Sequence, residues 1–538
     1  SFQGELKLPA NLTVIPMGCF LGCNFSTIAP LPESLTEIGD RAFESNSRLM
    51  GTIEFPESLI ALGSGAFSYC RTLEGIILPS ELGLIKASAF YDCYGLQKIV
   101  CRAAEPPILQ SEVFSGVAKD NFALEVPESA VNKYQADVQW GEFKRIAAHH
   151  DFTISRSRMR VLNAEHSRNF ILRAPANQAW SIESLPEWVT VTPSSGVGKT
   201  EVTVTVAQMT DAEVGSFEIK LTKKNSSQYN TETHAGRGGE VVFLLNDKDY
   251  RTTLSIEQYD YDYSDGQVLV HQTATAVDPK KGVNIVFMGD CFDARDIAKG
   301  TYLSGTAEAI DHFFAVEPYK TYKEYFNIYT VFGMSNDSGM GTVDTIRDAK
   351  FGSQYSLEGI TPDIETIIDY SYLTETVTKQ NFKHSLVVLV ENTTEYGGIT
   401  YMWTDGSAVA ICPMSDDAYP YDFRGIVQHE AGGHGFAKLA DEYIYHNAFI
   451  QSCQCICCDH LDGFLKTKAL GWYRNLEATG DMNKVGWSHL IFHPTYSNIV
   501  DIYEGGYFHT RGIYRSEPVS CMNNNIPYFS AISRQEAV

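Results

Sequence analysis

The chain has 538 residues, of which 44% are hydrophobic and 20% are charged. This length exceeds one ordinary hydrophobic core and the composition is that of folded proteins, so we expect two to four globular domains. The 42 Lys and Arg residues against 66 Asp and Glu give a formal charge of -24, which would repel a phosphate backbone and disfavours nucleic acid as a partner.

Neither a membrane span nor a signal region is recognisable in the sequence. No run approaches the ~18–20 apolar residues that cross a bilayer, so we expect no transmembrane segment. The first residues, "SFQGELKLPANLTVI", lack a basic start followed by an apolar stretch. We therefore expect that a signal or anchor region is absent from this chain or was removed.

The first 115 residues repeat with a period of 23 to 24 residues. Proline keeps this step, and so does phenylalanine, in three copies directly after an alanine: Pro9, Pro32, Pro56, Pro79, Phe20, Phe43, Phe67, Phe90 and Phe114. Units of this length cannot bury their own apolar side, so stacked copies share one core and form a solenoid. The pattern "IGDRAFESNSRLMGTIEFPESL" resembles the BspA-type leucine-rich repeats of bacterial surface proteins, and residues 126–146 are similar to the closing segment of such solenoids. We assign residues 1–147 to this domain.

A β-rich stretch follows, with alternating residues in "TEVTVTVAQ" from Thr200 and "RTTLSIEQY" from Arg251. This period of two is typical of half-buried strands. Residues 180–206 resemble the BACON module, an immunoglobulin-like β-sandwich of gut bacterial surface enzymes, which we assign to 151–260. Trp180 and Trp188 are candidates for stacking on sugar rings, but we favour core packing because tryptophan is mostly buried.

A third region, 268–538, alternates strands and helices. The segment "VNIVFM" is continuously apolar and ends in Gly289 and Asp290, which is typical of a buried strand that leads into a loop. "HSLVVLVEN" predicts a second such strand, "AEAIDHFFAV" predicts a helix, and "GGITYMWTDGSAVAICP" predicts two short strands around a turn. The pattern indicates an α/β domain, preceded by the acidic "YDYDYSDGQ" as a linker or exposed edge.

The segment "QHEAGGHGFAKLADEY" contains two histidines five residues apart, His429 and His434, with Glu430 directly after the first. Residues four apart on an α-helix differ by ~40° and can face one ion, whereas residues five apart differ by ~140°. A π-bulge restores the shared face, and Gly432 and Gly433 lie between the histidines, where each would weaken a plain helix by about 1 kcal/mol. We predict a metal site on a widened helical turn; the alternative is a pair of ordinary surface or core histidines.

Three neighbouring features strengthen the prediction of a metal site. Asp441 follows His434 by seven residues and offers an oxygen ligand. Edge-like strands lie just upstream, where a peptide can add as an extra strand. Near the C-terminus, "EPVSCMNNNIPYF" contains a Ser-Cys-Met turn that resembles the Met-turn of metzincins, with Met522 as its hydrophobic floor.

From about 268 to 538 the chain resembles the bacterial IgA metallopeptidase family, through "VNIVFMGDCF", "HEAGGHGFAKLADEY" and "SCMNNNIPYF". The resemblance implies a zincin-like, metzincin-like α/β fold. This sequence departs from the family by one extra residue inside the zinc motif. Dipeptidyl peptidases that read H-E-L-L-G-H show that a zinc site can have the longer spacing.

The resemblance also implies roles for individual residues. His429 and His434 would bind Zn²⁺ through imidazole nitrogens, with Asp441 as the third ligand and Glu442 as its alternate. Glu430 would take a proton from zinc-bound water and return it to the leaving amine.

The resemblance also implies a candidate stabiliser of the tetrahedral oxyanion, because metzincins often use a tyrosine just beyond the Met-turn. Tyr528 is the candidate by position, and Tyr443 and Tyr514 are alternatives. Core packing is the interpretation we favour for any one of them.

A cysteine cluster, "CQCICC", lies between His446 and His460. Its spacing does not match the usual paired spacing of structural zinc sites. A soft-metal site, disulfides within the cluster or to Cys412 or Cys521, and a loop of simple thiols all stay open, and we leave the cluster out of the metal prediction.

Three function classes follow from the sequence. The first is a secreted or cell-surface zinc endopeptidase that hydrolyses extracellular proteins, with host proteins and immunoglobulin A among the candidate substrates. The second is an inactive surface adhesin that binds glycan or host surface through its N-terminal domains. A carbohydrate-active enzyme is a third hypothesis, but no pair of catalytic carboxylates can be identified in the sequence to support it.

Overall fold

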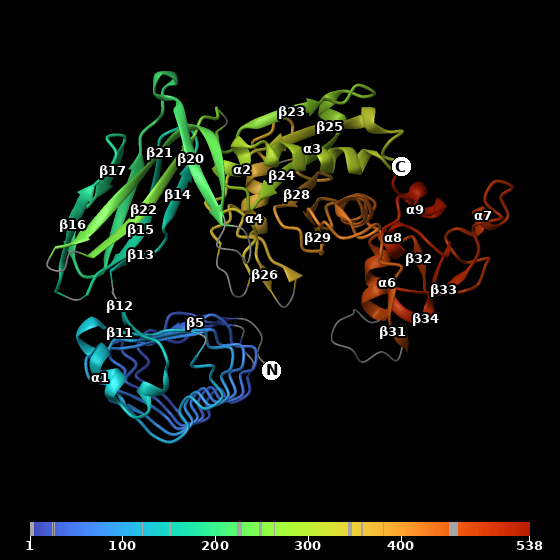
Figure 1. Cartoon of the computed structure of the whole chain (residues 1–538). Helices are drawn as coiled ribbons and strands as arrows, with labels where there is room; N and C mark the ends of the chain where they lie inside the picture. Colours follow the sequence, from blue (N-terminus) through green and yellow to red (C-terminus); the bar gives the residue numbers. More distant parts are fainter. Residues whose placement is uncertain are drawn as a thin grey trace.

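The computed structural model has three successive bodies, a solenoid, a two-sheet body and an α/β body (Figure 1). Within the described residues, no helix is both long enough and apolar enough to cross a membrane. The structure describes residues 5–23, 25, 27–120, 122–149, 152–175, 177–222, 229–246, 250–262, 264–342, 347–356, 359–379, 381–450 and 461–538.

The solenoid presents two parallel five-stranded sheets, one on each side of its coil. The first contains β2 (Val14–Ile15), β4 (Glu37–Ile38), β6 (Ala61–Leu62), β8 (Leu84–Ile85) and β10 (Ile108–Leu109). The second contains β5 (Thr52–Glu54), β7 (Gly75–Leu78), β9 (Lys98–Cys101), β11 (Leu124–Pro127) and β12 (Ile146–His149). A separate pair joins β1 (Glu5–Leu6) to β3 (Thr27–Ile28).

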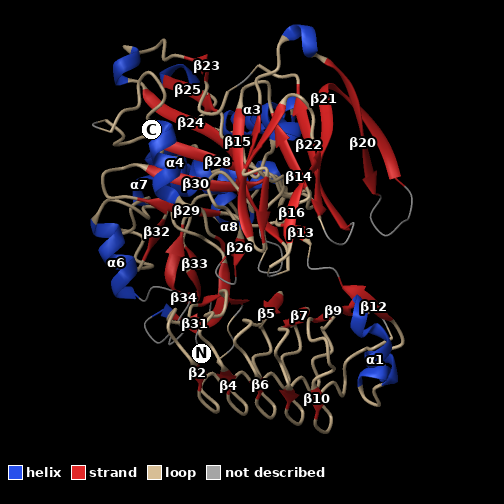
Figure 2. Ribbon diagram, turned by 90° about the vertical axis from the view of Figure 1, so that its left-hand side faces the viewer, coloured by secondary structure: helices blue, strands red, loops and turns tan. Residues whose placement is uncertain are grey.

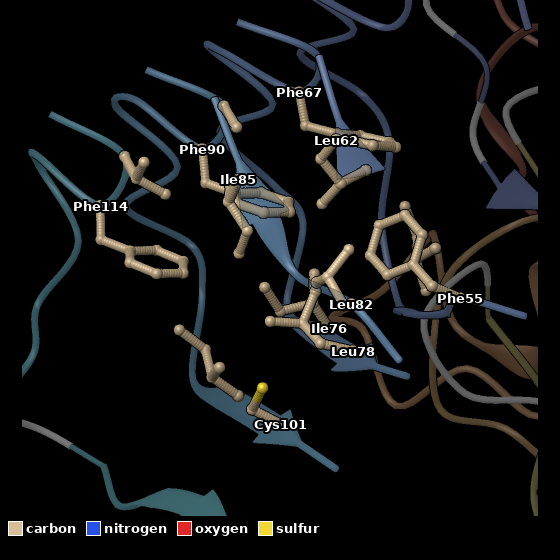
Figure 3. Close-up of a cluster of buried hydrophobic side chains, with 14 of the residues drawn as sticks. Phe55, Leu62, Phe67, Ile76, Leu78, Leu82, Ile85, Phe90, Cys101 and Phe114 are labelled. Atoms are coloured by element: carbon tan, nitrogen blue, oxygen red, sulfur yellow. The ribbon is translucent and has the colours of Figure 1, made fainter. Parts of the chain in front are cut away.

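The repeated phenylalanines form a continuous ladder inside the coil, of which Figure 3 labels Phe67, Phe90 and Phe114. Ring centroids of successive copies lie 5.2, 4.9, 5.6 and 5.6 Å apart from Phe20 to Phe114, which confirms the predicted shared core. The coil ends at a cap of η1 (Glu128–Ala130), α1 (Val131–Ala136) and η2 (Trp140–Glu142). The fully buried Trp140 of this cap lies 5.5 Å from Phe114 and covers the last ring.

The second body is a β-sandwich whose two sheets share one core. One sheet orders β13 (Thr153–Ile154), β15 (His166–Arg173), β19 (Thr200–Val206) and β17 (Val189–Thr192). The other orders β14 (Arg158–Val161), β22 (Tyr250–Tyr259), β21 (Tyr229–Leu245), β16 (Ala179–Ser184) and β18 (Ser195–Val197), with β20 (Gly215–Thr222) paired to β21. Its resemblance to the BACON module stays a prediction.

Both tryptophans of the sandwich pack against other side chains of the domain. Trp180 is fully buried in the core and donates its indole N–H to Thr200 Oγ1 at 3.2 Å. Trp188 is partly buried beneath the Arg237 guanidinium, which lies 4.6 Å from its ring centroid. The favoured packing role therefore fits the geometry of both side chains.

The third body is built on a six-stranded mixed sheet. The order is β23 (Val268–Gln272), β25 (Phe326–Val331), β24 (Val283–Asp290), β28 (Leu386–Glu391), β30 (Ala408–Pro413) and β29 (Ile399–Met402). The four central strands are parallel, and β29 is an antiparallel edge strand beside β30. The sheet buries apolar side chains on both faces, which explains the unbroken apolar runs in the sequence.

Helices and a smaller sheet complete this body. The helices are α2 (Ala294–Ala298), α3 (Thr301–Phe314), α4 (Ile364–Ser371), α5 (Phe423–Ile426), α6 (Leu461–Ala469), α7 (Ser488–Ile491), α8 (Cys521–Asn524) and α9 (Ala531–Glu536). The smaller sheet joins β31 (Ile444–Phe449), β34 (Phe508–Arg515), β32 (Leu476–Glu477) and β33 (Tyr503–Gly506). In Figure 2 its strands β31, β33 and β34 are drawn below the large sheet, on the side of the solenoid.

The prediction that residues 259–267 form a linker or exposed edge is wrong for the first of these residues, Tyr259. Tyr259 is the last residue of β22, is only 1% exposed, and packs into the core of the α/β body together with Leu162 of the sandwich. An acidic, tyrosine-rich stretch looks solvent-exposed in sequence, but this ring fills a space between two bodies.

Candidate metal centre

The histidine motif lies on a π-helix, η6 (Val427–Phe436), which directly follows α5. The Ala437 N–H donates to the Gly432 carbonyl five residues earlier, at 3.1 Å. This spacing brings residues five apart onto one face, and the imidazole centroids of His429 and His434 lie only 4.9 Å apart. The predicted widening of the turn is confirmed, although it extends over ten residues and not over a single turn.

Asp441 joins the two histidines. Its Oδ1 lies 3.0 Å from His429 Nε2 and 3.2 Å from His434 Nε2, and the three candidate ligand atoms lie within 4.8 Å of one another. Asp441 lies in the segment after η6, which turns back across the face that presents both imidazoles. The structure thus brings together all three residues proposed as metal ligands.

Backbone carbonyls hydrogen-bonded to Nδ1 fix the orientation of both imidazoles. His429 Nδ1 lies 3.0 Å from the Cys521 carbonyl, and His434 Nδ1 lies 2.8 Å from the Leu439 carbonyl. A carbonyl only accepts, so each Nδ1 carries a proton, and Nε2 is the nitrogen of each ring that faces Asp441 and would bind a metal after losing its own proton. Histidines that bind metals in proteins are almost always held in this way.

The electrostatics of the site favour a bound cation. Burial disfavours the Asp441 carboxylate, but the neighbouring imidazoles, His434 most strongly, hold its pKa well below the ordinary value. Burial alone would lower the pKa of His434, but Asp441 more than offsets this and raises that pKa to about 9. The negative charge that here attracts protons onto histidine is the charge that a divalent cation would neutralise.

Glu430 points to the edge strand of the large sheet. The Thr400 hydroxyl of β29 donates to Glu430 Oε2 at 2.7 Å and approaches the Glu430 carbonyl at 3.1 Å. A Cβ on Gly398 would lie 2.8 Å from Glu430 Oε1, so the absence of a side chain there leaves room for the carboxylate. Sequence reasoning missed Thr400 and Gly398, because only the pairing of β29 with β30 brings them to the motif.

The two glycines of the motif are sites of close packing. A Cβ on Gly433 would lie 2.0 Å from the sulfur of Met522, and one on Gly432 would lie 3.1 Å from the Tyr319 ring. Met522 is fully buried beneath η6, and the Tyr319 hydroxyl donates to the Gly432 carbonyl at 2.6 Å. The glycines thus allow the turn around Met522 to lie directly under the histidines.

We expect that Gly433→Ala destabilises the folded chain by about 1–3 kcal/mol, because the added methyl group must displace the Met522 sulfur in a filled core. Gly83→Ala is the control: nothing lies within 4 Å of its added Cβ, and its effect should stay below about 1 kcal/mol. Differential scanning calorimetry of both full-length variants measures the difference. Equal transitions for the two would contradict the close packing.

Glu442, the alternate ligand, is turned away from the metal site. Its carboxylate accepts from Ser520 Oγ at 2.6 Å and from Asn475 Nδ2 at 3.0 Å, and its N–H donates to the Met522 carbonyl. Burial raises the pKa of Glu442 to about 7, although these two donors lower it. The side chain ties the segment after η6 to the turn around Met522, and Asp441 is the residue that faces the histidines.

Of the three candidate tyrosines, Tyr443 is the one beside the site. Its ring stacks against His429 with centroids 6.1 Å apart, and it interacts electrostatically with the Asp441 carboxylate. Burial, and the Asp441 charge next, raise the pKa of Tyr443, so the phenol keeps its proton. The Tyr528 hydroxyl donates instead to Glu517 at 2.7 Å, and the Tyr514 hydroxyl to Glu504 at 3.4 Å.

A second group of ligand-type side chains lies at the carboxyl ends of β24 and β28, where Asp290, Cys291 and Glu391 are all buried. Protein donors already occupy these carboxylates. Asp290 accepts from four groups, the N–H of Cys291, Phe351 and Ser353 and the hydroxyl of Ser335, at 2.8–3.2 Å, and Glu391 accepts from the Ser353 hydroxyl at 2.6 Å. We interpret the group as a structural hydrogen-bond centre.

This centre predicts a pH dependence of stability. Burial, with Asp290 next, raises the pKa of Glu391 well above its ordinary value of 4.5. Between 4.5 and that raised value the unfolded chain releases a proton that the folded chain keeps, so stability falls as pH rises. In Glu391→Gln this loss disappears, and unfolding measured from pH 5 to 8 should depend less on pH than in wild type. Glu395→Gln, at an exposed position, is the control; identical pH curves for all three proteins would contradict the prediction.

Two further sequence predictions concern cysteines. The cluster between Cys453 and Cys458 lies outside the described residues. Cys412 and Cys521, considered above as disulfide partners, are free thiols and fully buried.

Comparison with known proteins supports two of the three bodies. Residues 3–119 match the BspA type leucine rich repeat region in six copies, and residues 272–453 match IgA Peptidase M64. No curated protein matches the chain. Among solved structures, a Bacteroides ovatus GH5 xyloglucanase in complex with a XXXG heptasaccharide matches with 15% identity and a TM-score of 0.15, over 24% of this chain and 24% of that chain. A score this low does not indicate a shared fold.

Proposed function

We propose that this chain, which joins BspA-type leucine-rich repeats to an IgA peptidase M64 domain, is a zinc-dependent endopeptidase that cleaves extracellular proteins. The observation that supports it most is the convergence of His429, His434 and Asp441 inside the matched peptidase segment. A peptidase follows from the family; zinc and the substrate class are the added proposals.

The donor set fits zinc. Two neutral imidazoles and one carboxylate are the ligand types that zinc enzymes use, with one position left open for chemistry. Each imidazole is oriented by a backbone carbonyl at its Nδ1, so both Nε2 atoms face Asp441, where the metal would bind. When bound, zinc supplies a Lewis acid that polarises the scissile carbonyl and acidifies water.

Glu430 is the proposed general base and acid. It follows His429 directly and lies beside the trio without belonging to it, as a proton carrier requires. Its carboxylate would take a proton from the attacking water and deliver it to the nitrogen of the leaving amine. The Thr400 hydroxyl at 2.7 Å holds this carboxylate at the edge strand.

We propose that the substrate backbone binds along the edge strand β29. Among the described strands it pairs with β30 alone, so its other side has main-chain groups available for an extended peptide. Thr400 belongs to this strand and contacts Glu430. A peptide added along β29 would therefore pass the proposed base.

Tyr443 is proposed to support Asp441 through its hydroxyl. We expect that Tyr443→Phe lowers activity or zinc affinity by about 10–100-fold, the usual cost of losing an outer hydrogen bond to a metal ligand. Tyr528→Phe is the matched control and should stay within about twofold, because its hydroxyl is bound to Glu517. Steady-state kinetics and a zinc titration compare them, and a larger loss in the Tyr528 variant would reverse the assignment.

The proposed extracellular location and substrate class are inferred from the domains that accompany the peptidase segment. BspA-type repeats are typical of secreted and surface proteins, which supports an extracellular substrate and makes immunoglobulin A a candidate. The solenoid or the sandwich would contact host surface or glycan. The inactive-adhesin alternative was based on the extra residue in the motif, and the π-helix accommodates that residue with the histidines together.

The test is metal-dependent cleavage by the purified full chain. We expect cleavage of casein or immunoglobulin A that a chelator abolishes and that one equivalent of zinc restores. Failure to cleave any of a broad peptide library with zinc fully bound would contradict the proposed function and favour the adhesin.

A further inference from the structure

The β-sandwich and the peptidase body are packed against each other through a shared core and buried ion pairs. Leu162 and Tyr259 of the sandwich lie in the same hydrophobic cluster as Ile285 of β24. Arg160 of β14 bonds Glu257 at 2.8 Å and also pairs with Asp293, the N-cap of α2, and all three side chains are at most 13% exposed. Figure 1 shows β14 and β22 beside α2. Partly buried pairs of this kind hold geometry more firmly than exposed ones.

Two more sandwich arginines reach a loop of the peptidase body. Arg156 pairs with Asp337, and Arg168 Nη2 lies 2.7 Å from Asp348 Oδ2. These two aspartates also bind each other, because the Asp348 N–H donates to Asp337 Oδ2 at 2.8 Å and the Asp337 N–H donates to the Asp348 carbonyl at 3.2 Å. Asp337 and Asp348 are the two ends of one loop, and the arginines bind this loop at the point where its ends meet.

After Asp348 the chain continues directly into the structural hydrogen-bond centre around Asp290 and Glu391. The Lys350 N–H donates to Ser335 Oγ, whose hydroxyl donates to Asp290 at 2.9 Å. On the other side, Ser353 donates its N–H to Asp290 and its hydroxyl to Glu391. The loop therefore fixes the carboxyl ends of β24 and β28.

From these strand ends the contacts continue to the edge strand. Asn392, directly after β28, donates its side-chain amide to the Cys291 carbonyl at 3.0 Å and to Asp296 of α2 at 3.1 Å. Tyr355, two residues beyond Ser353, donates its hydroxyl to the Glu395 carbonyl at 3.1 Å. The segment 392–398 held in this way leads into β29, which contains Thr400, the partner of Glu430.

We propose that the β-sandwich is a positioning part of the peptidase: its arginines Arg156 and Arg168 hold the loop that fixes segment 392–402, the substrate edge beside Glu430. The positioning itself follows from the contacts above. Its effect on catalysis rests on the proposed function. The sandwich is then a working element of the enzyme and not a separable module.

The test uses the full chain with the double substitution Arg156→Gln and Arg168→Gln. We expect hydrogen exchange in residues 392–402 to accelerate about tenfold in the zinc-free protein, while amides in the solenoid keep their rates. For the zinc-loaded protein we expect KM for a peptide substrate to rise about tenfold with kcat changed less, because the metal ligands are not in the network. With Arg168→Lys in place of Arg168→Gln in the double variant, the exchange rates and KM should return part of the way to the wild-type values.

Arg251→Gln is the matched control, because it removes an exposed arginine–carboxylate pair of the sandwich, with Glu183, away from the loop. Asp348→Asn cuts the same contact from the loop side and serves if the double variant does not fold. Unchanged exchange in 392–402 for both the double variant and Asp348→Asn would overturn the inference. Accelerated exchange in a chain that cleaves nothing would support the positioning and contradict only the proposed function.

Discussion

Glu430→Gln should abolish cleavage, with kcat reduced on the order of 10³-fold or more, while the protein still binds one zinc. The glutamine keeps the shape of the side chain and can still contact Thr400, but it cannot accept the proton of the attacking water. The three ligand atoms belong to other residues, so the metal site should be unchanged. Kinetics on a peptide substrate, together with zinc content measured on the same sample, give the result.

The control for this variant is Glu375→Gln, an exposed carboxylate of the same body that lies outside segment 392–402. It should retain wild-type turnover. If Glu430→Gln and its control cleave equally well, Glu430 is not the general base. If Glu430→Gln loses its zinc, the carboxylate is part of the metal site and the assigned roles are wrong.

Asp441→Asn should lower zinc affinity by more than about 100-fold, beyond the usual cost of losing an outer partner of a metal ligand. Asp441 Oδ1 lies near both Nε2 atoms, and an amide lacks the negative charge of the carboxylate. Glu442→Gln tests the neighbouring carboxylate, which bonds Ser520 and Asn475 and does not reach the histidines. Competition against a zinc chelator of known affinity measures both variants.

The two substitutions separate the alternatives left open by the sequence. Retained affinity in Glu442→Gln with lost affinity in Asp441→Asn is the expected pattern. The opposite pattern would assign the third ligand to Glu442 and would require the segment after η6 to rearrange on metal binding.

Much of the architecture could be predicted because it depends on local periodicity. The phenylalanine step of 23 to 24 residues gives the solenoid, and alternating or continuous apolar runs give the strands of the other bodies. The π-helix could also be predicted, because two glycines between histidines five apart are costly in a plain α-helix.

Contacts between distant segments could not be predicted in the same way. Tyr528 was the candidate by analogy with a turn, whereas the chain path brings Tyr443 to Asp441 and Tyr528 to Glu517. Thr400 reaches Glu430 only because β29 folds back as the edge of the sheet. The grip of Arg156 and Arg168 on the loop needs the packing of two bodies, for which no spacing in the sequence is a signal.

The central claim is that a widened helical turn brings two histidines and an aspartate to one zinc ion. Anomalous scattering at the zinc edge from crystals of the zinc-loaded chain tests it most directly. We expect a single strong peak at about 2.0–2.2 Å from His429 Nε2, His434 Nε2 and an Asp441 oxygen. A zinc-loaded crystal without a peak between these residues, or with the two imidazoles turned to opposite sides, would contradict it.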